Sequence, residues 1–136
     1  MKKLKVLKYI FLSILLTLFT FEGIASGTYT PQSAYQSRQS DVQVHSRGVV
    51  IKIFQDDNSG SRHQKFILEL ARGHTVLIAH DIDLAPRISS IKRGDTVEFN
   101  GEYEWNAKGG VVHWTHYDPK GKHPGGWLKH NGKLYE

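Results

Sequence analysis

The segment TVEFNGEYEW, residues 96–105, decides the fold class because apolar and polar side chains alternate along it. In a β-strand, successive side chains point to opposite faces. One face of this segment is mainly apolar: Val97, Phe99, Tyr103 and Trp105. The other face is polar: Glu98, Asn100, Glu102 and Glu104. The alternation predicts a strand with one face in a core and the other toward solvent.

The segment HQKFILEL, residues 63–70, alternates in the same way, with Gln64, Phe66, Leu68 and Leu70 on one face. Three more segments are rich in β-forming residues: 42–54, 74–80 and 111–117. Turns that contain Gly or Asn separate most of these strands. A connection that contains Pro86 lies between the third and fourth strands, and the C-terminal end is predicted to be a loop with one packed segment around Trp127 and Leu128.

Five short strands without a clear helix predict an all-β fold. The best match is a small five-stranded antiparallel barrel, OB-like, in which the usual helix between the third and fourth strands is reduced or absent. A small β-sandwich is the alternative.

The N-terminal residues 1–25 have the layout of a secretory signal peptide, with four lysines, an apolar run and small residues before a cleavage site at Ala25. The apolar run is shorter than the roughly 20 residues that a membrane-spanning helix needs. We therefore expect cleavage, export to the periplasm or the medium, and no membrane span in the mature chain. Residues 26–41 are polar and predict a flexible linker, which leaves residues 42–136 for the barrel domain.

Removal of residues 1–25 takes away four lysines and Glu22, and lowers the formal net charge from +5 to +2. A mildly basic domain gives only weak support to nucleic acid as a partner. All eight histidines lie after residue 25 and would add positive charge as the pH falls. The absence of cysteine excludes disulfides, a thiol nucleophile and thiolate metal sites.

Histidines and aspartates are expected to converge at one pole of the barrel. If successive strands reverse direction, four strand ends meet at this pole: the end of strand one, the start of strand two, and the ends of strands three and five. Polar groups at a barrel mouth are typical of binding sites. With the aromatic and histidine side chains of residues 109–127, the candidate binding residues are His63, His80, Asp81, Trp114, His116, Asp118, His123 and Trp127.

The same pole offers an alternative metal site. Imidazole and carboxylate groups bind divalent metals such as zinc or manganese, and four residues could supply them: His63, His80, His116 and Asp118. His113 and His116 are three positions apart, so a regular strand would point them to opposite faces. They can share an ion only if the strand bulges or ends before His116. Three other histidines are expected on the solvated surface: His45, His74 and His130.

Aromatic and basic residues leave further alternatives open. Tyr103 and Trp105 are expected in the core, whereas Trp114 and Trp127 either pack at the barrel end or form a stacking platform for bases or sugars. Four late lysines either follow a phosphate backbone or form a solvated tail: Lys120, Lys122, Lys129 and Lys133.

Five motifs resemble the bacterial family of domain of unknown function 3465: DDNSGSRHQKFIL, AHDIDLAPR, GDTVEFNGEYEWN, GGVVHWTHYDP and GWLKHNGKLY. The resemblance covers roughly residues 49–135. Two positions differ from the family's pattern, because Asp81 stands where Asn is usual and Tyr117 stands where a second His often appears. The resemblance implies a short exported protein without an established activity, and it supplies no catalytic residues.

Three functions remain open at this point. The first is an exported OB-like binding module for a small anion, an oligonucleotide or a glycan. The second is a metal-dependent hydrolase, such as a nuclease, in which His63, His80 and His116 hold the ion and Asp118 or Asp81 serves as ligand or base. The third is a structural accessory protein of the cell envelope.

Overall fold

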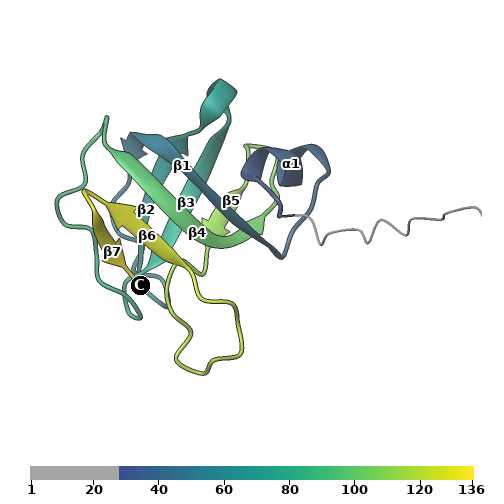
Figure 1. Ribbon diagram of the computed structural model, residues 1–136. Coiled ribbons are helices and arrows are strands. Elements are labelled where there is room, and N and C mark those ends of the chain that lie inside the picture. Colours follow the sequence, from purple (N-terminus) through teal and green to yellow (C-terminus); the bar gives the residue numbers. More distant parts are fainter. Residues whose placement is uncertain (1–27) are drawn as a thin grey trace, which may run out of the picture.

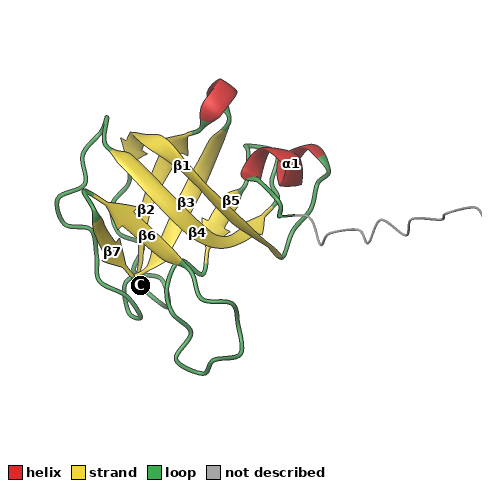
Figure 2. Cartoon of the chain, viewed as in Figure 1, coloured by secondary structure: helices red, strands yellow, loops and turns green. Residues whose placement is uncertain are grey.

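The computed structural model describes residues 28–136, and the predicted signal peptide lies outside the described residues. A β-barrel with a short helix beside it makes up the described part (Figure 1). Strands and loops account for most of this part, and the helices are short (Figure 2). Among residues 28–136, no helix has the length and apolar character that crossing a membrane requires.

Seven strands form one sheet: β1 (Val42–Ile53), β2 (His63–Glu69), β3 (Thr75–Asp81), β4 (Thr96–Glu104), β5 (Val111–His113), β6 (Trp127–His130) and β7 (Lys133–Tyr135). The strand order is β1–β2–β3–β5–β4–β6–β7, and an additional pairing between β1 and β4 closes the first five into a barrel. β3 and β5 are parallel, and the other neighbours are antiparallel. This five-stranded barrel confirms the OB-like fold class. The β6–β7 hairpin extends the sheet beyond β4, where the sequence predicted mainly loop.

Strand β1 serves both sides of the barrel because its first half pairs with β4 and its second half pairs with β2. Gly48 lies where the two pairings meet. A Cβ atom at Gly48 would lie 2.7 Å from the carbonyl oxygen of Glu69 and 2.7 Å from the Leu70 side chain. Only glycine permits this close approach, which the barrel needs for closure.

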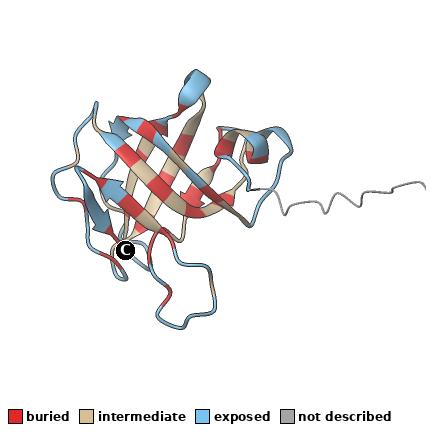
Figure 3. Ribbon diagram, in the orientation of Figure 1, coloured by how far each residue is buried: buried red, intermediate tan, exposed pale blue. Residues whose placement is uncertain are grey.

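The predicted alternation is confirmed by burial, with buried and partly exposed residues alternating along the barrel strands (Figure 3). Phe66 and Leu68 of β2 and Phe99 of β4 have no exposed surface. Tyr103 is also fully buried, and its hydroxyl donates to the Gly109 carbonyl at 2.7 Å. Burial raises the pKa of Tyr103 to about 12. The core therefore forms from the faces that the sequence assigned to it.

An irregular segment, rather than a helix, closes the barrel between β3 and β4. Ile88 of this segment is fully buried, and the side chain of Gln64 binds its backbone in both directions, at 2.8 Å and 2.9 Å. His80 Nε2 lies 2.9 Å from the Pro86 carbonyl oxygen and holds the same segment. Buried polar side chains thus hold this segment over the barrel, where a helix would otherwise close it. This role explains why Gln64 shares a face with core residues.

The short helix α1 (Pro31–Gln36) packs on the barrel where a flexible linker was expected over residues 26–41. Ala34 is fully buried, and the Tyr35 ring stacks on Trp105 with centroids 6.2 Å apart. The Trp105 indole N–H donates to the Tyr35 carbonyl at 3.1 Å. The linker prediction is therefore wrong for this helix, because two apolar contacts within a polar segment are enough to dock it.

Candidate functional site

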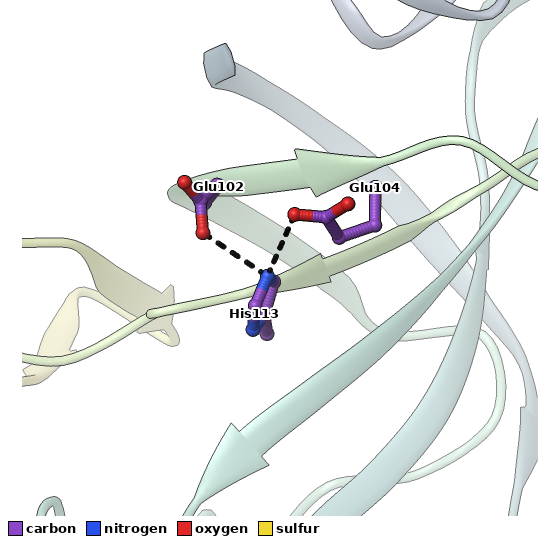
Figure 4. A group of neighbouring side chains, drawn as sticks. All are labelled: Glu102, Glu104 and His113. Carbon is purple, nitrogen blue, oxygen red and sulfur yellow. Dashed lines mark hydrogen bonds and ion pairs between the residues drawn. The ribbon is translucent and has the colours of Figure 1, made fainter. Parts of the chain in front are cut away.

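Two glutamates and a histidine meet on the outer face of the barrel (Figure 4). β4 and β5 are antiparallel, and Glu102 lies directly opposite His113. His113 Nε2 lies 3.2 Å from Glu102 Oε2 and 3.4 Å from Glu104 Oε1. Among residues 28–136, this is the one group of three or more potential metal ligands whose atoms all lie within 4.8 Å of one another. We call Glu102, Glu104 and His113 the carboxylate–histidine cluster.

The two glutamates of this cluster have no lysine or arginine partner among the described residues. Burial, and then the neighbouring Asp41 carboxyl group, raise the pKa of Glu104 above its ordinary value, although His113 lowers it. A positive charge placed between the two glutamates would therefore be stabilised.

The loop after β5 brings a second imidazole to the cluster. Trp114 has a φ of 53°, so the strand ends at His113. The Trp114 ring stacks on His123, with centroids 3.8 Å apart and planes 11° apart. His123 Nε2 lies 3.3 Å from Glu102 Oε1, the oxygen that does not face His113. Glu102 therefore lies between two histidines that are distant in the sequence.

Asp118 organises this loop rather than binding a ligand. Its carboxylate accepts three backbone N–H bonds, from Lys120 at 3.0 Å, Lys122 at 3.0 Å and His123 at 2.8 Å. These bonds, led by those from Lys120 and His123, hold the pKa of Asp118 below its ordinary value. The carboxylate thus binds its own loop at three points, a role that the sequence, which offered Asp118 as a candidate metal ligand, did not predict.

A hollow of about 200 Å³ borders the cluster, lined by His63, Asp81, Leu84, His113, Trp114 and His116. His63 and Asp81 face each other across β2 and β3, with Nε2 3.9 Å from Oδ2. Ser61 fixes this pair, because its hydroxyl donates to Asp81 Oδ2 at 2.7 Å and its carbonyl lies 2.8 Å from His63 Nδ1. The hollow is therefore lined by four polar side chains, one tryptophan and one leucine, and no Lys or Arg of the described residues lines it.

His116 is the most enclosed histidine of the hollow, with 4% of its surface exposed. Its Nδ1 lies 2.8 Å from the Tyr117 carbonyl oxygen, and its Nε2 has no hydrogen-bond partner among residues 28–136. His113 and His116 both line the hollow, which the sequence analysis allowed only if the strand bulges or ends before His116. The reason is that β5 ends at His113, and His116 already belongs to the loop.

His80 does not belong to the hollow, although it lies at the predicted pole. Its side chain points into the barrel and is fully buried, with Nδ1 2.7 Å from Thr115 Oγ1 and Nε2 2.9 Å from the Pro86 carbonyl oxygen. Burial is the main cause that lowers the pKa of His80 to about 4. Both ring nitrogens are occupied, so the alternative metal set of His63, His80, His116 and Asp118 does not form.

Trp127 and His130 also differ from their expected roles. Trp127 lies opposite Asn100 on β4 and packs edge-on against His45, with ring centroids 5.2 Å apart. It does not line the hollow. His130 is buried, not solvated, and its Nε2 lies 2.8 Å from Asp95 Oδ2.

Of the eight candidate binding residues, four line the hollow: His63, Asp81, Trp114 and His116.

Glu102 and Glu104 were predicted on a polar face but were not among the candidate site residues. The turn NAKGG, residues 106–110, could have indicated these two glutamates, because it forms a hairpin that places the end of β4 beside the start of β5. A histidine on β5 must then face a carboxylate on β4. The four late lysines are exposed, and two of them lie in strands rather than in a tail: Lys129 in β6 and Lys133 in β7.

Fold and site together define a small OB-like barrel with a carboxylate–histidine cluster beside a polar hollow. The chain belongs to the family described as protein of unknown function, DUF3465, which matches residues 12–136. No curated protein matches the chain. Among solved structures, the hypothetical protein ygiW from E. coli is similar, with 24% identity and a TM-score of 0.42 over 64% of this chain and 83% of that chain.

Proposed function

We propose that the protein is an exported binding module whose hollow takes a small, uncharged ligand rich in hydroxyl groups, such as the end of a glycan. The observation that carries this proposal is the lining of the hollow, where one tryptophan stands beside one carboxylate and three imidazoles. A carboxylate accepts hydrogen bonds from hydroxyl groups, and a neutral imidazole both accepts and donates them. An aromatic ring offers an apolar surface to the carbon face of a sugar.

Charge favours this ligand over the anion and the oligonucleotide. No Lys or Arg lines the hollow within the described residues, and Asp81 contributes a negative charge there. Glu102 and Glu104 add carboxylates next to His113. A phosphate backbone needs cationic partners, and these carboxylates would repel it.

The volume of the hollow limits the size of the ligand group that it can hold. A volume of about 200 Å³ is below the roughly 300–1,000 Å³ of typical drug-sized pockets. One sugar ring, with the rest of a chain in solvent, suits such a site. We expect weak binding, in the range of about 0.1–1 mM.

Tryptophan fluorescence and amide chemical shifts in a buffer with chelator would test the proposal. The probes are a neutral disaccharide such as N,N′-diacetylchitobiose, inorganic phosphate and a short oligothymidylate. We expect the disaccharide alone to shift the signals, and His63→Ala and Trp114→Ala to weaken its binding at least tenfold. The matched controls, His45→Ala and Trp127→Phe, lie outside the hollow and should bind normally. Saturable binding of phosphate or oligothymidylate without disaccharide binding would refute the proposed ligand class.

Export is the second part of the proposal and rests on the lysines and the apolar run of residues 1–25. N-terminal sequencing of the protein from the periplasm or the medium should give a chain that begins at Ser26. A full-length chain that stays with the membrane fraction would show that export with cleavage does not occur.

A further inference from the structure

We propose that Glu102, Glu104 and His113 form a binding site for one divalent transition-metal ion of the zinc class, with His123 beside this site on the loop after β5. This inference goes beyond the proposed function, because it concerns an ion on the outer face of β4 and β5 and requires no ligand in the hollow. It also differs from the metal set that the sequence predicted.

The spacing of the ligand atoms is the first argument. His113 Nε2 lies 3.2 Å from Glu102 Oε2 and 3.4 Å from Glu104 Oε1. Zinc binds nitrogen and oxygen ligands at about 2.0–2.2 Å in a tetrahedron, which puts neighbouring ligand atoms roughly 3.3–3.5 Å apart. The two distances from His113 match this spacing, and the ligand atoms of all three residues lie within 4.8 Å of one another.

Two of the three other histidine–carboxylate pairs among residues 28–136 are direct contacts and provide an internal comparison; the third, His63 with Asp81, is longer, at 3.9 Å. His45 Nε2 lies 2.7 Å from Glu98 Oε1, and His130 Nε2 lies 2.8 Å from Asp95 Oδ2. These are the distances of direct charge-assisted hydrogen bonds. The contacts of the cluster are all longer, and His113 Nε2 faces two carboxylates at once, although one N–H can point at only one of them.

The tautomer of His123 is an independent argument. Its Nδ1 lies 2.8 Å from the Pro124 carbonyl oxygen, which only accepts hydrogen bonds, so Nδ1 carries the proton. In the neutral ring, Nε2 then has a bare lone pair, yet it lies 3.3 Å from the Glu102 carboxylate. A hydrogen bond from Nδ1 to a backbone carbonyl is the usual way in which a protein orients a metal-binding imidazole.

The chain also holds His123 in this orientation. Trp114 stacks on the imidazole at 3.8 Å, and Asp118 accepts the backbone N–H of His123 at 2.8 Å. The nearby His116 is 4% exposed with an unpartnered Nε2 among the described residues, and it lines the hollow that His113 shares. No lysine or arginine is among the described residues that line this hollow next to His113.

The test is zinc binding by the untagged protein after treatment with chelator, because a histidine tag would itself bind the ion. Isothermal titration with zinc chloride, followed by desalting and elemental mass spectrometry, should give about one zinc per chain. Glu104→Gln and His113→Gln should weaken the affinity at least tenfold, and His123→Ala should weaken it to a smaller extent. The matched controls are Glu98→Gln and His45→Ala, which disrupt a direct histidine–glutamate pair on the same outer face and should bind zinc normally.

Cobalt substitution gives a second readout. The visible absorption of the cobalt protein should be that of a four-coordinate site and should disappear in Glu104→Gln, a substitution of nearly unchanged shape that spares the fold. Circular dichroism melting confirms that each variant is folded. A wild-type protein that retains no more zinc than His113→Gln overturns the proposal, and so does equal binding by wild type and all variants. The saccharide titration is made with chelator present, so failure of one proposal does not imply failure of the other.

Discussion

The rings of Trp114 and His123 stack face to face, with centroids 3.8 Å apart and planes 11° apart. This stack closes the loop between β5 and β6 and places His123 against Glu102. The loop is thus held by an aromatic contact at its start and by the Asp118 carboxylate within it.

Loss of the stack should destabilise the protein. We expect Trp114→Ala to lower the free energy of unfolding by about 2 kcal/mol, since it removes a half-buried aromatic ring and its stacking partner. Trp114→Phe keeps a ring on His123 and should recover at least half of that loss. Urea unfolding followed by circular dichroism measures both. Equal stability of the alanine and phenylalanine variants would contradict the importance of the stack.

Loss of the Asp118 carboxylate should open the loop locally. Asp118→Ala leaves three backbone N–H groups without their acceptor: those of Lys120, Lys122 and His123. We expect hydrogen exchange at these amides to accelerate at least tenfold, while amides of the barrel strands remain protected. Asp118→Asn supplies one acceptor oxygen instead of two and should give an intermediate result. Unchanged exchange at all three amides would count against this role.

Stability should decrease as the pH falls from about 6.5 to 4, with a contribution from His80. Burial lowers the pKa of His80 to about 4 in the folded chain, against 6.5 for an unperturbed histidine. The unfolded chain therefore binds this proton more readily in that window, and folding is favoured above pH 6.5 and loses stability down to pH 4. The difference of about 2.5 pKa units corresponds to about 3 kcal/mol.

Urea unfolding at several pH values tests the role of His80. His80→Gln removes the titrating group and keeps an amide that can bond to Thr115 and Pro86, so its stability should change much less over this window. The exposed His45 provides the control, because His45→Ala should keep the wild-type slope. Parallel curves for wild type and His80→Gln would refute the prediction. The carboxylates with lowered pKa, such as Asp118, lose their stabilising contribution mainly below their ordinary pKa of 3.8, at the acidic end of this window.

Two adjacent glycines should respond differently to alanine. A Cβ at Gly126 would overlap the backbone carbonyl oxygens of Trp114 and Asn100, whereas a Cβ at Gly125 would have its nearest contact at 3.9 Å. We expect Gly126→Ala to lower the melting temperature by about 10 °C or more, because backbone atoms cannot give way without moving β6. Gly125→Ala should remain within about 3 °C of wild type. Similar melting temperatures for the two variants would contradict the close approach.

Much of the barrel could be predicted because strand alternation is a local property. The apolar faces of residues 63–70 and 96–105 appear in the sequence itself, and their burial follows once a sheet forms. The β6–β7 hairpin was missed because its strands are only four and three residues long and lie in a segment rich in Gly and Lys. Helix α1 was missed because its docking depends on Tyr35 and Trp105, which are far apart in the chain.

The site was predicted only in part, for a physical reason. Strand direction placed His63, His80 and Asp81 at one pole, and the pairing of β2 with β3 agrees. Alternation within each strand then separated them, because His80 points into the barrel and Asp81 lines the hollow outside it. A prediction based on poles alone does not distinguish the two sides of the barrel wall.

By itself, the sequence determined the family, the strand segments, their buried faces and the absence of cysteine chemistry, because these depend on local residue patterns. Only the tertiary structure decided which histidines meet which carboxylates. The contact of His113 with Glu102 follows from strand pairing, and the contact of His123 with Glu102 follows from a loop held by Trp114 and Asp118. Such contacts depend on chain reversal and side-chain orientation, which residue order does not specify locally.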